Sequence, residues 1–290
     1  MNRNSIYGAV IGDIVGSYPE VIEMRAKING DKVTYKERIK YLNPKQKLFS
    51  DNLCVTDDTI LTVAVADAVL CGGNYAEKIK TYGQNAVAEG FDKYGRNPFG
   101  KKFIEWLNGD FEGTSYGNGC AMRISPIGYI FPTLEQTLLA SDTATLPTHN
   151  TTEAILCARA VAGSIFLART NHSKHEIEQF VEQTLGIKLD YELADLQENN
   201  VFTSRAITSV PQAIYCFLIS NNFEDCLRKT LSIGADADTL CAISCSIASA
   251  FYGLEDWWIK EADKYIPQQF KVTLEKFSDK FIRSEYENIK

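Results

Sequence analysis

The sequence predicts an all-α fold, and two observations carry that prediction. Several segments are apolar on every side or place apolar residues at helical spacing, as buried and amphipathic helices do. No segment alternates apolar and polar residues over a useful length, and no strand–helix–strand rhythm appears. The 290 residues contain no linker-like stretch and no internal repeat. We therefore expect residues 1–290 to form a single compact domain.

The N-terminal segment predicts a helix that packs closely against a neighbour. Gly8, Gly12 and Gly16 recur every four residues, which places them on one helical face and lets another backbone approach. Pro19 is expected to end this helix, because proline breaks helix interiors. Glu20 would then lie on a loop.

Seven further helices are expected along the chain. Residues 59–71 are apolar almost all round, and residues 151–170 are rich in Ala, Ile and Leu, which is typical of buried helices. Pro211 stands in the first turn of a helix expected at 210–220. The other expected helices are 174–185, 223–232, 238–252 and a surface helix at 266–289. Irregular structure is expected at 24–50, 94–100, 109–119 and 141–150.

Composition argues against several classes of protein. Thirty Lys and Arg against 37 Asp and Glu give a net charge of −7, which disfavours a broad surface for nucleic acid. The eight cysteines include no Cys-x-x-Cys pair and mostly lie in apolar stretches, as reduced buried thiols of a cytoplasmic protein do. Residues 240–254 are too few to span a bilayer, which takes about 20 apolar residues. No export signal is convincing, so we expect a cytoplasmic protein without a membrane segment.

Two short acidic clusters precede apolar helices and indicate a metal site. Residues 56–59 read Thr-Asp-Asp-Thr, and residues 236–239 read Asp-Ala-Asp-Thr. Helix capping explains one such residue at each helix start. The two starts should lie close together in a bundle, where four carboxylates repel one another unless cations separate them. Hard oxygen ligands suit Mg²⁺, Mn²⁺ or Ca²⁺, and two divalent ions about 4 Å apart are a usual arrangement.

A turn rich in Gly, Ser and Asn at residues 113–119 leads into an apolar segment. Such a turn can present backbone N–H groups to an anion, and Tyr116 could stack on a base. A turn without any ligand is the more common meaning of this composition. His149 stands in a Thr-His-Asn stretch ahead of the helix expected at 151–170, and by itself it predicts nothing.

Taken in order, these motifs resemble the ADP-ribosylglycohydrolase family over about residues 7–253. They are G-x-x-x-G-D-x-x-G-S with a following Glu20, T-D-D at 56–58, Y-G-N-G and A-M-R at 116–123, Thr-His at 148–149, and D-x-D-T at 236–239. The resemblance implies an all-α orthogonal bundle with two Mg²⁺ or Mn²⁺ ions. The implied metal ligands are Thr56, Asp57, Asp58, Asp236, Asp238 and Thr239. The implied binding residues for the diphosphate and adenosine are Ser115, Tyr116, Gly117, Asn118 and Gly119, with His149 nearby.

The activity implied by the resemblance is hydrolysis of the glycosidic bond at C1″ of ADP-ribose. The substrate would be an ADP-ribosylated protein, nucleobase or small molecule, and the transition state would resemble an oxocarbenium ion. A carboxylate among Glu20, Asp57 and Asp58 would act as general base. Glu20 resembles a mobile glutamate that contributes to the metal site or gates it.

Some parts of the sequence depart from the family pattern. Ala235 and Ala237 replace residues that are commonly Gly and Thr or Ser in the family, and neither position supplies a ligand, so metal binding should survive. Residues 24–50 match no family motif. They lie near the expected entrance, so we expect them to influence which aglycone fits.

Two other functions are compatible with parts of the pattern. A module on the same fold could bind ADP-ribose or a partner protein without turnover, although all six implied metal ligands and Glu20 are present. An Asp-rich metalloenzyme of prenyl-diphosphate chemistry is disfavoured because position 61 is Leu, which breaks the D-D-x-x-D spacing. The sequence leaves open which linkage is cut, which of the two metals is used, and the oligomeric state.

Overall fold

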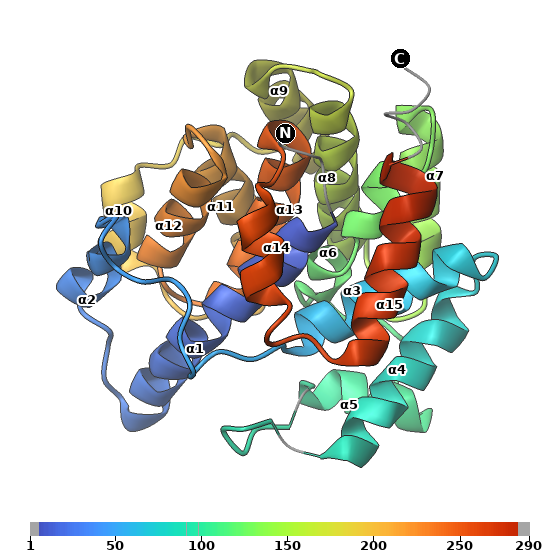
Figure 1. Ribbon diagram of the computed structural model, residues 1–290, viewed down its shortest axis with the longest axis horizontal. Coiled ribbons are helices and arrows are strands. Elements are labelled where there is room, and N and C mark those ends of the chain that lie inside the picture. The colour runs from blue at the N-terminus through green and yellow to red at the C-terminus, as the bar shows by residue number, and fades with distance from the viewer. Residues whose placement is uncertain (1–5, 91, 98, 284–290) are drawn as a thin grey trace.

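The computed structural model describes residues 6–90, 92–97 and 99–283, and its regular elements are all helical (Figure 1). No β-strand occurs among these residues, where two isolated bridges join loops, Thr114 with His149 and Gly117 with Arg205. The predicted all-α fold is confirmed. No helix in the described part of the chain has the length and apolar character needed to cross a membrane.

The described residues form fifteen α-helices and three short 3₁₀ or π segments. The α-helices are α1 (Tyr7–Asn29), α2 (Tyr35–Ile39), α3 (Asp57–Leu70), α4 (Tyr75–Glu89), α5 (Lys101–Asn108), α6 (Gly119–Met122), α7 (Leu134–Thr145), α8 (Thr152–Arg169), α9 (Lys174–Leu185), α10 (Leu193–Asn199), α11 (Ala206–Leu218), α12 (Phe223–Ser232), α13 (Ala237–Tyr252), α14 (Asp256–Ala262) and α15 (Gln268–Phe277). The short segments are η1 (Lys40–Leu42), η2 (Ser125–Tyr129) and η3 (Ser278–Arg283).

Helices α1 and α13 form an antiparallel pair at the centre of the bundle. At Gly8, Gly12 and Gly16 an added Cβ would come within 2.5 Å of an atom of α13. As α1 advances from Gly8 to Gly16, its contacts on α13 move back from Ser249 to Ala237. The close packing predicted from the glycine spacing is confirmed, and it places the start of α13 beside the middle of α1.

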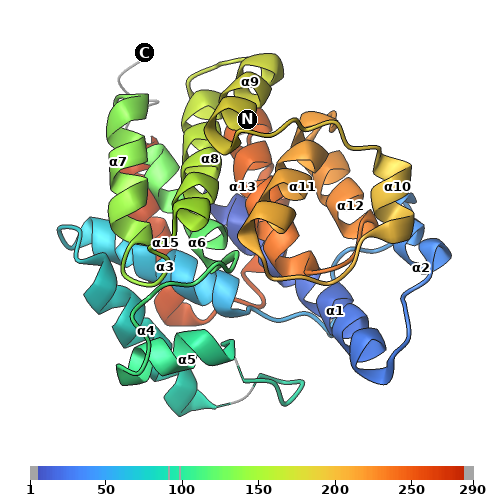
Figure 2. The same ribbon diagram turned by 180° about the vertical axis from the view of Figure 1, so that it is seen from behind.

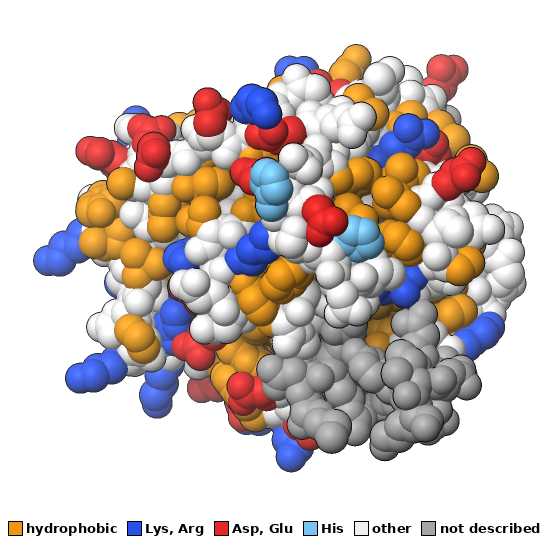
Figure 3. All heavy atoms as spheres, turned by 90° about the horizontal axis from the view of Figure 1, so that it is seen from above, with side chains coloured by type: hydrophobic (Ala, Val, Ile, Leu, Met, Phe, Trp, Pro, Cys, Tyr) orange, Lys and Arg blue, Asp and Glu red, His pale blue; other side chains and the backbone are white. Residues whose placement is uncertain are grey.

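Helix α13 is the core of the molecule. Every residue from Ala237 to Ala250 is buried, and α1, α8, α11 and α12 all pack against this helix (Figures 1 and 2). Apart from Asp238, these side chains are small or apolar, which fits a buried position without large cavities or unpaired charges. On the face drawn in Figure 3, acidic and basic side chains are interspersed outside the grey atoms, and no broad basic patch is visible there.

Pro19 does not end α1, so the prediction that Glu20 lies on a loop is wrong. The helix runs through Pro19 and continues to Asn29. Proline in a helix interior removes one hydrogen bond and costs about 3 kcal/mol. Tertiary packing offsets that cost, because Val21 and Glu23 beyond the proline are both buried against the rest of the fold.

Residues 24–50 are more regular than expected and are held against α12. They contain the end of α1, all of α2 and η1. The buried Arg228 of α12 anchors the chain that follows by donating to four backbone carbonyls, those of Tyr41, Asn43, Pro44 and Gln46, at 3.0–3.3 Å. A single guanidinium thus supplies hydrogen-bond donors that this irregular stretch lacks.

Most of the other predicted helices are confirmed with small shifts at their ends. The predictions at 174–185 and 223–232 coincide with α9 and α12, and those at 59–71, 151–170 and 238–252 differ from α3, α8 and α13 by one or two residues. Helix α11 begins four residues earlier than predicted, because the N–H of Ala206 is held by the carbonyl of Tyr116 at 2.9 Å. Pro211 therefore lies inside the helix.

Two other expectations require correction or lie partly outside the description. Residues 141–150 are not irregular throughout, since α7 extends to Thr145 from a start capped by Thr133, whose hydroxyl accepts from the N–H of Gln136. The helix expected at 266–289 is present as α15 followed by η3, and residues 284–289 lie outside the described residues. Helices α2, α4, α5, α6, α7, α10 and α14 are additional to the prediction.

Gly12→Ala is expected to destabilise the fold. The new Cβ would lie 2.2 Å from the carbonyl oxygen of Cys241, and both atoms belong to core helix backbones that cannot move apart freely. We expect a loss of about 1–3 kcal/mol or more in the free energy of unfolding, measured by urea titration. Gly100→Ala is the control, since its Cβ would meet no atom within 4 Å and its φ is −65°. Equal stability of the two variants would contradict the close approach of α1 and α13.

Candidate active site

A cavity of about 910 Å³ opens where the starts of α3, α6 and α13 meet the side of α1. This volume is within the range of pockets that enclose a small molecule. Every site residue predicted from the sequence lines it: Glu20, Thr56, Asp57, Asp58, Ser115, Tyr116, Gly117, Asn118, Gly119, His149, Asp236, Asp238 and Thr239. Its wall also includes the aromatic side chains of Phe99, Phe103, Trp106 and Phe111.

Residues 24–50 contribute little to this cavity. Among them Met24 is the one lining residue in the described part of the chain. The expected influence of this segment on the aglycone is therefore limited to Met24, because Arg228 holds the stretch after Ile39 against α12 instead.

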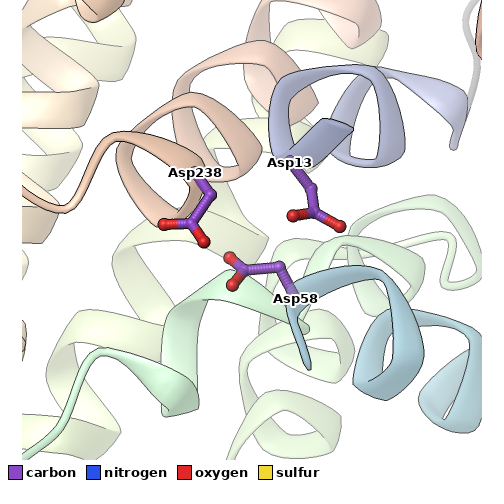
Figure 4. A group of neighbouring side chains, drawn as sticks. All are labelled: Asp13, Asp58 and Asp238. Atoms are coloured by element: carbon purple, nitrogen blue, oxygen red, sulfur yellow. The ribbon is translucent and has the colours of Figure 1, made fainter. Parts of the chain in front are cut away.

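Three carboxylates from three different helices converge beside the cavity, and two of them, Asp58 and Asp238, line it. Asp13 comes from α1, Asp58 from α3 and Asp238 from α13, and their side chains point toward one another (Figure 4). One oxygen from each lies within 4.8 Å of the other two, and all three residues are buried. The predicted meeting of the two acidic clusters is therefore what the structure shows, with Asp13 as an additional member.

A second group of carboxylates shares one member with the first. Oxygens of Glu20, Asp236 and Asp238 also lie within 4.8 Å of one another. Glu20 is in addition ion-paired with Arg96, which pairs with Asp92 at 2.7 Å as well. Asp238 thus belongs to both groups of carboxylates.

Asp13 is one of the site residues that the sequence prediction missed, with Arg96, Arg123 and Thr148. Its Oδ1 accepts from the hydroxyl of Thr56 at 2.6 Å, and its Oδ2 accepts from the N–H groups of Thr56 and Thr59 at 3.0 and 3.1 Å. These bonds anchor the start of α3, where Asp58 stands. The spacing of seven residues between Asp13 and Glu20 is a usable signal, because residues seven positions apart lie on the same face of a continuous helix. The expected helix end at Pro19 places Glu20 on a loop and so removes this spacing from consideration.

Two residues in the left-handed backbone conformation precede α13 and set the direction in which this helix begins. Gly234 has φ 64° and Ala235 has φ 62°, a conformation that costs about 1–2 kcal/mol for a residue with a Cβ. The turn places Asp236 at the N-cap and Asp238 in the first helical turn. Ala235 therefore occupies a position whose backbone geometry favours glycine.

The structure adds detail to the predicted roles of Thr56, Asp57 and Asn118. The hydroxyl of Thr56 caps α3 by accepting from the N–H of Asp58 at 3.3 Å. Asp57 is half-buried on the cavity wall and belongs to neither carboxylate group among the described residues. The side chain of Asn118 donates to Asp236 at 2.7 Å, so this amide orients a carboxylate.

Burial and mutual repulsion raise the pKa of the clustered carboxyl groups. Burial is the larger cause, and it raises the pKa of Asp13 to about 6 and that of Asp236 to about 7. Burial, with the neighbouring carboxylates, raises the pKa of Asp57, Asp58 and Asp238 well above the usual value. A cation among these groups would favour their charged forms.

The residues present fit a site for hard divalent cations. Asp58 Oδ1 is buried and has no hydrogen-bond partner among the described residues. The hydroxyl of Thr239 lies 3.3 Å from Asp58 Oδ2 and adds a neutral oxygen. Carboxylate and hydroxyl oxygens without any His or Cys are the donor set that Mg²⁺ and Mn²⁺ prefer.

The turn at residues 113–119 forms another part of the cavity wall. The N–H of Gly117 donates to Ser115 Oγ at 3.1 Å, and that of Asn118 donates to the carbonyl of Ser204 at 2.7 Å. These two backbone donors are thus used within the fold. Binding of an anion by this turn stays a prediction. Tyr116 is 49% exposed, and the guanidinium of Arg205 lies 5.7 Å from its ring centroid.

Comparison with known proteins finds a matching family model, similar curated proteins and a solved structure with the same fold. A family model described as ADP-ribosylglycohydrolase matches residues 3–288. ADP-ribosylhydrolase ARH3 of Bos taurus is 25% identical to this chain, over 91% of this chain and 88% of that protein. ADP-ribosylarginine hydrolase Tri1 of Pseudomonas putida (strain GB-1) is 23% identical, over 69% of this chain and 59% of that protein. A solved structure described as an ADP-ribosylglycohydrolase-related protein complex has the same fold, with a TM-score of 0.63 at 19% identity, covering 95% of this chain and 96% of that one.

The raised pKa of Asp236 predicts a pH-dependent effect of Asp236→Asn. The folded protein favours the protonated carboxyl, so the stability linked to this group is present below about pH 4 and is lost as the pH rises through about 7. In EDTA we expect the melting temperature of Asp236→Asn to rise relative to wild type between about pH 4 and about pH 8. The exposed Asp190→Asn is the control. A difference that stays constant over this range would contradict the carboxylate cluster.

Proposed function

Because the chain belongs to the ADP-ribosylglycohydrolase family, we propose that it is a hydrolase of the C1″ glycosidic bond of ADP-ribose that uses two Mg²⁺ or Mn²⁺ ions. Its substrate would be an ADP-ribosylated protein, nucleobase or small molecule. One observation carries the proposal: two groups of buried carboxylates share Asp238 on the wall of a cavity of about 910 Å³. Paired oxygen clusters of this kind are suited to two neighbouring divalent ions.

The chain's own carboxylates divide the proposed metal site between them. Asp13, Asp58 and Asp238 would hold one ion, and Glu20, Asp236 and Asp238 the other. Thr56 and Thr239 supply hydroxyl groups beside them. When bound, such ions orient ribose hydroxyl groups and lower the pKa of a coordinated water.

Three carboxylates are candidates for the general base, and their positions differ. Glu20 is ion-paired with Arg96, and Asp58 belongs to the first carboxylate group. Asp57 lines the cavity and belongs to neither group among the described residues. Asp57 is therefore the carboxylate best placed to accept a proton from an attacking water while the others hold cations.

The Gly-rich turn and the aromatic wall fit the nucleotide end of the substrate. Tyr116 projects half-exposed at the cavity, and only one face of its ring is approached by Arg205. Its other face would be available for stacking on adenine. Ser115, Gly117, Gly119 and His149 line the cavity beside it and would contact the diphosphate.

Asp58→Asn is expected to abolish turnover while the fold persists. The substitution removes one charge from the group formed with Asp13 and Asp238, so divalent ions should bind far more weakly. We expect release of ADP-ribose to fall at least about a hundredfold, and the Mg²⁺-dependent rise in melting temperature to be lost. Release is followed on serine-linked, arginine-linked and small ester substrates, with Asp190→Asn as control.

Two outcomes of this experiment would count against the proposal. Full activity of Asp58→Asn with added Mg²⁺ would show that the metal assignment is wrong. Stabilisation of wild type by ADP-ribose without cleavage of any linkage would favour a module that binds ADP-ribose or a protein partner without turnover.

Tyr116→Ala is expected to weaken ADP-ribose binding by about 1–3 kcal/mol, because stacking of one base on an aromatic ring contributes that much. Isothermal titration with ADP-ribose and Mg²⁺ measures the change. Tyr35→Ala is a matched control, since Tyr35 is 45% exposed and lies outside the cavity. Unchanged affinity in Tyr116→Ala would remove this ring from the site.

A further inference from the structure

Arg123 is a completely buried cation that forms no ion pair among the described residues, although the charge of Asp57 acts on it from a distance. Its exposure is 0%, and no ion pair in the described part of the chain includes it. Its Nε and Nη1 atoms have no hydrogen-bond partner among the described residues. Burial lowers the pKa of Arg123 to about 10. A buried unpaired charge is costly, so its retention at the cavity wall calls for a functional explanation.

The one side-chain hydrogen bond that Arg123 makes to the described residues leads to a histidine through a hydroxyl group. Arg123 Nη2 donates to Thr148 Oγ1 at 2.5 Å, and Thr148 Oγ1 lies 2.7 Å from His149 Nδ1. A guanidinium has donors only, so the hydroxyl accepts from Arg123. The described residues offer this hydroxyl no other acceptor than His149 Nδ1, so its own proton is directed to that nitrogen. Nδ1 then accepts a hydrogen bond, and the proton of a neutral ring resides on Nε2.

The charge of Arg123 also keeps this ring neutral. Burial is the larger cause and the nearby guanidinium the second, and together they lower the pKa of His149 well below its usual value. A protonated ring would carry a proton on Nδ1 and could not accept from Thr148. Charge and hydrogen bonding thus favour the same neutral tautomer.

The Nε2 edge of His149 faces the Gly-rich turn. A Cβ built on Gly119 would lie 3.4 Å from Nε2, and one built on Gly117 would lie 3.5 Å from it. The isolated bridge with Thr114 holds the backbone of His149 beside the same turn. The N–H groups of Gly117 and Asn118 are already used within the fold, so a further donor at this turn would strengthen the binding of an anion.

We propose that Arg123 is a positioning residue that, through the hydroxyl of Thr148, holds His149 as an Nε2–H donor to the diphosphate of ADP-ribose. The identity of the anion rests on the proposed function. The tautomer of His149 does not, because it follows from hydrogen bonds within the chain.

The tautomer can be measured directly by ¹⁵N nuclear magnetic resonance of the imidazole rings. The chain has three histidines, His149, His172 and His175, so substitution of the other two assigns the signals. In ligand-free wild type near neutral pH we expect His149 to be protonated at Nε2 alone. Thr148→Val removes the hydroxyl donor and should populate the Nδ1–H form, whereas Thr148→Ser should retain the wild-type signals. An Nδ1–H ring in wild type, or no change in Thr148→Val, would overturn the proposal.

Binding measurements test the consequence for the ligand. Thr148→Val should weaken ADP-ribose about tenfold, the effect of one hydrogen bond to a charged group, and leave Mg²⁺ affinity unchanged. Thr148→Ser should bind within about twofold of wild type. Arg123→Met should act like Thr148→Val, and if Arg123→Met fails to fold the Thr148 pair still decides the matter.

The two failures are distinguishable. Equal ADP-ribose affinity in wild type and Thr148→Val would overturn the role of this relay in binding. A wild-type protein that binds no ADP-ribose would overturn the proposed function and the diphosphate as ligand, whereas the ¹⁵N spectra would still decide whether Arg123 and Thr148 set the tautomer of His149.

Discussion

The close antiparallel contact of α1 with α13 is the constraint on which the site depends. Gly8, Gly12 and Gly16 let the two backbones meet, and the next position on this four-residue stripe is Glu20. The stripe therefore carries a carboxylate to the start of α13, where Asp236 stands. The same helix contact that stabilises the fold at Gly8, Gly12 and Gly16 therefore also sets the position of Glu20 relative to Asp236 and Asp238.

Burying several carboxylates close together is unfavourable, because they lose hydration and repel one another. Hydrogen bonds and one ion pair within the fold offset part of this cost. Asp13 receives hydrogen bonds from the start of α3, Asn118 donates to Asp236, and Arg96 pairs with Glu20. Asp58 Oδ1 retains no partner among the described residues. Such incomplete compensation is expected of a site built for cations, because their charge supplies the missing interaction.

Another part of the cavity wall carries a buried positive charge. Arg123 is buried without an anionic partner, and its charge and hydrogen bond act on His149 through Thr148. The two carboxylate groups thus have Arg96 as their ion-paired cation, whereas Arg123 has no ion-pair partner among the described residues. Under the proposed function, the diphosphate of ADP-ribose and the bound cations would together supply the opposite charges that these groups lack.

Local chemistry explains which site features are predictable from sequence. The two acidic clusters at 56–58 and 236–239 are recognisable because N-caps and first-turn acids are set by a few adjacent residues. The continuation of α1 through Pro19, and with it the positions of Asp13 and Glu20, is not local, since packing beyond the proline outweighs its propensity. The contacts of Asn118 with Asp236 and of Arg96 with Glu20 join residues at least 76 positions apart. Only the folded chain decides such pairs, because helix packing and not sequence spacing brings their side chains into reach.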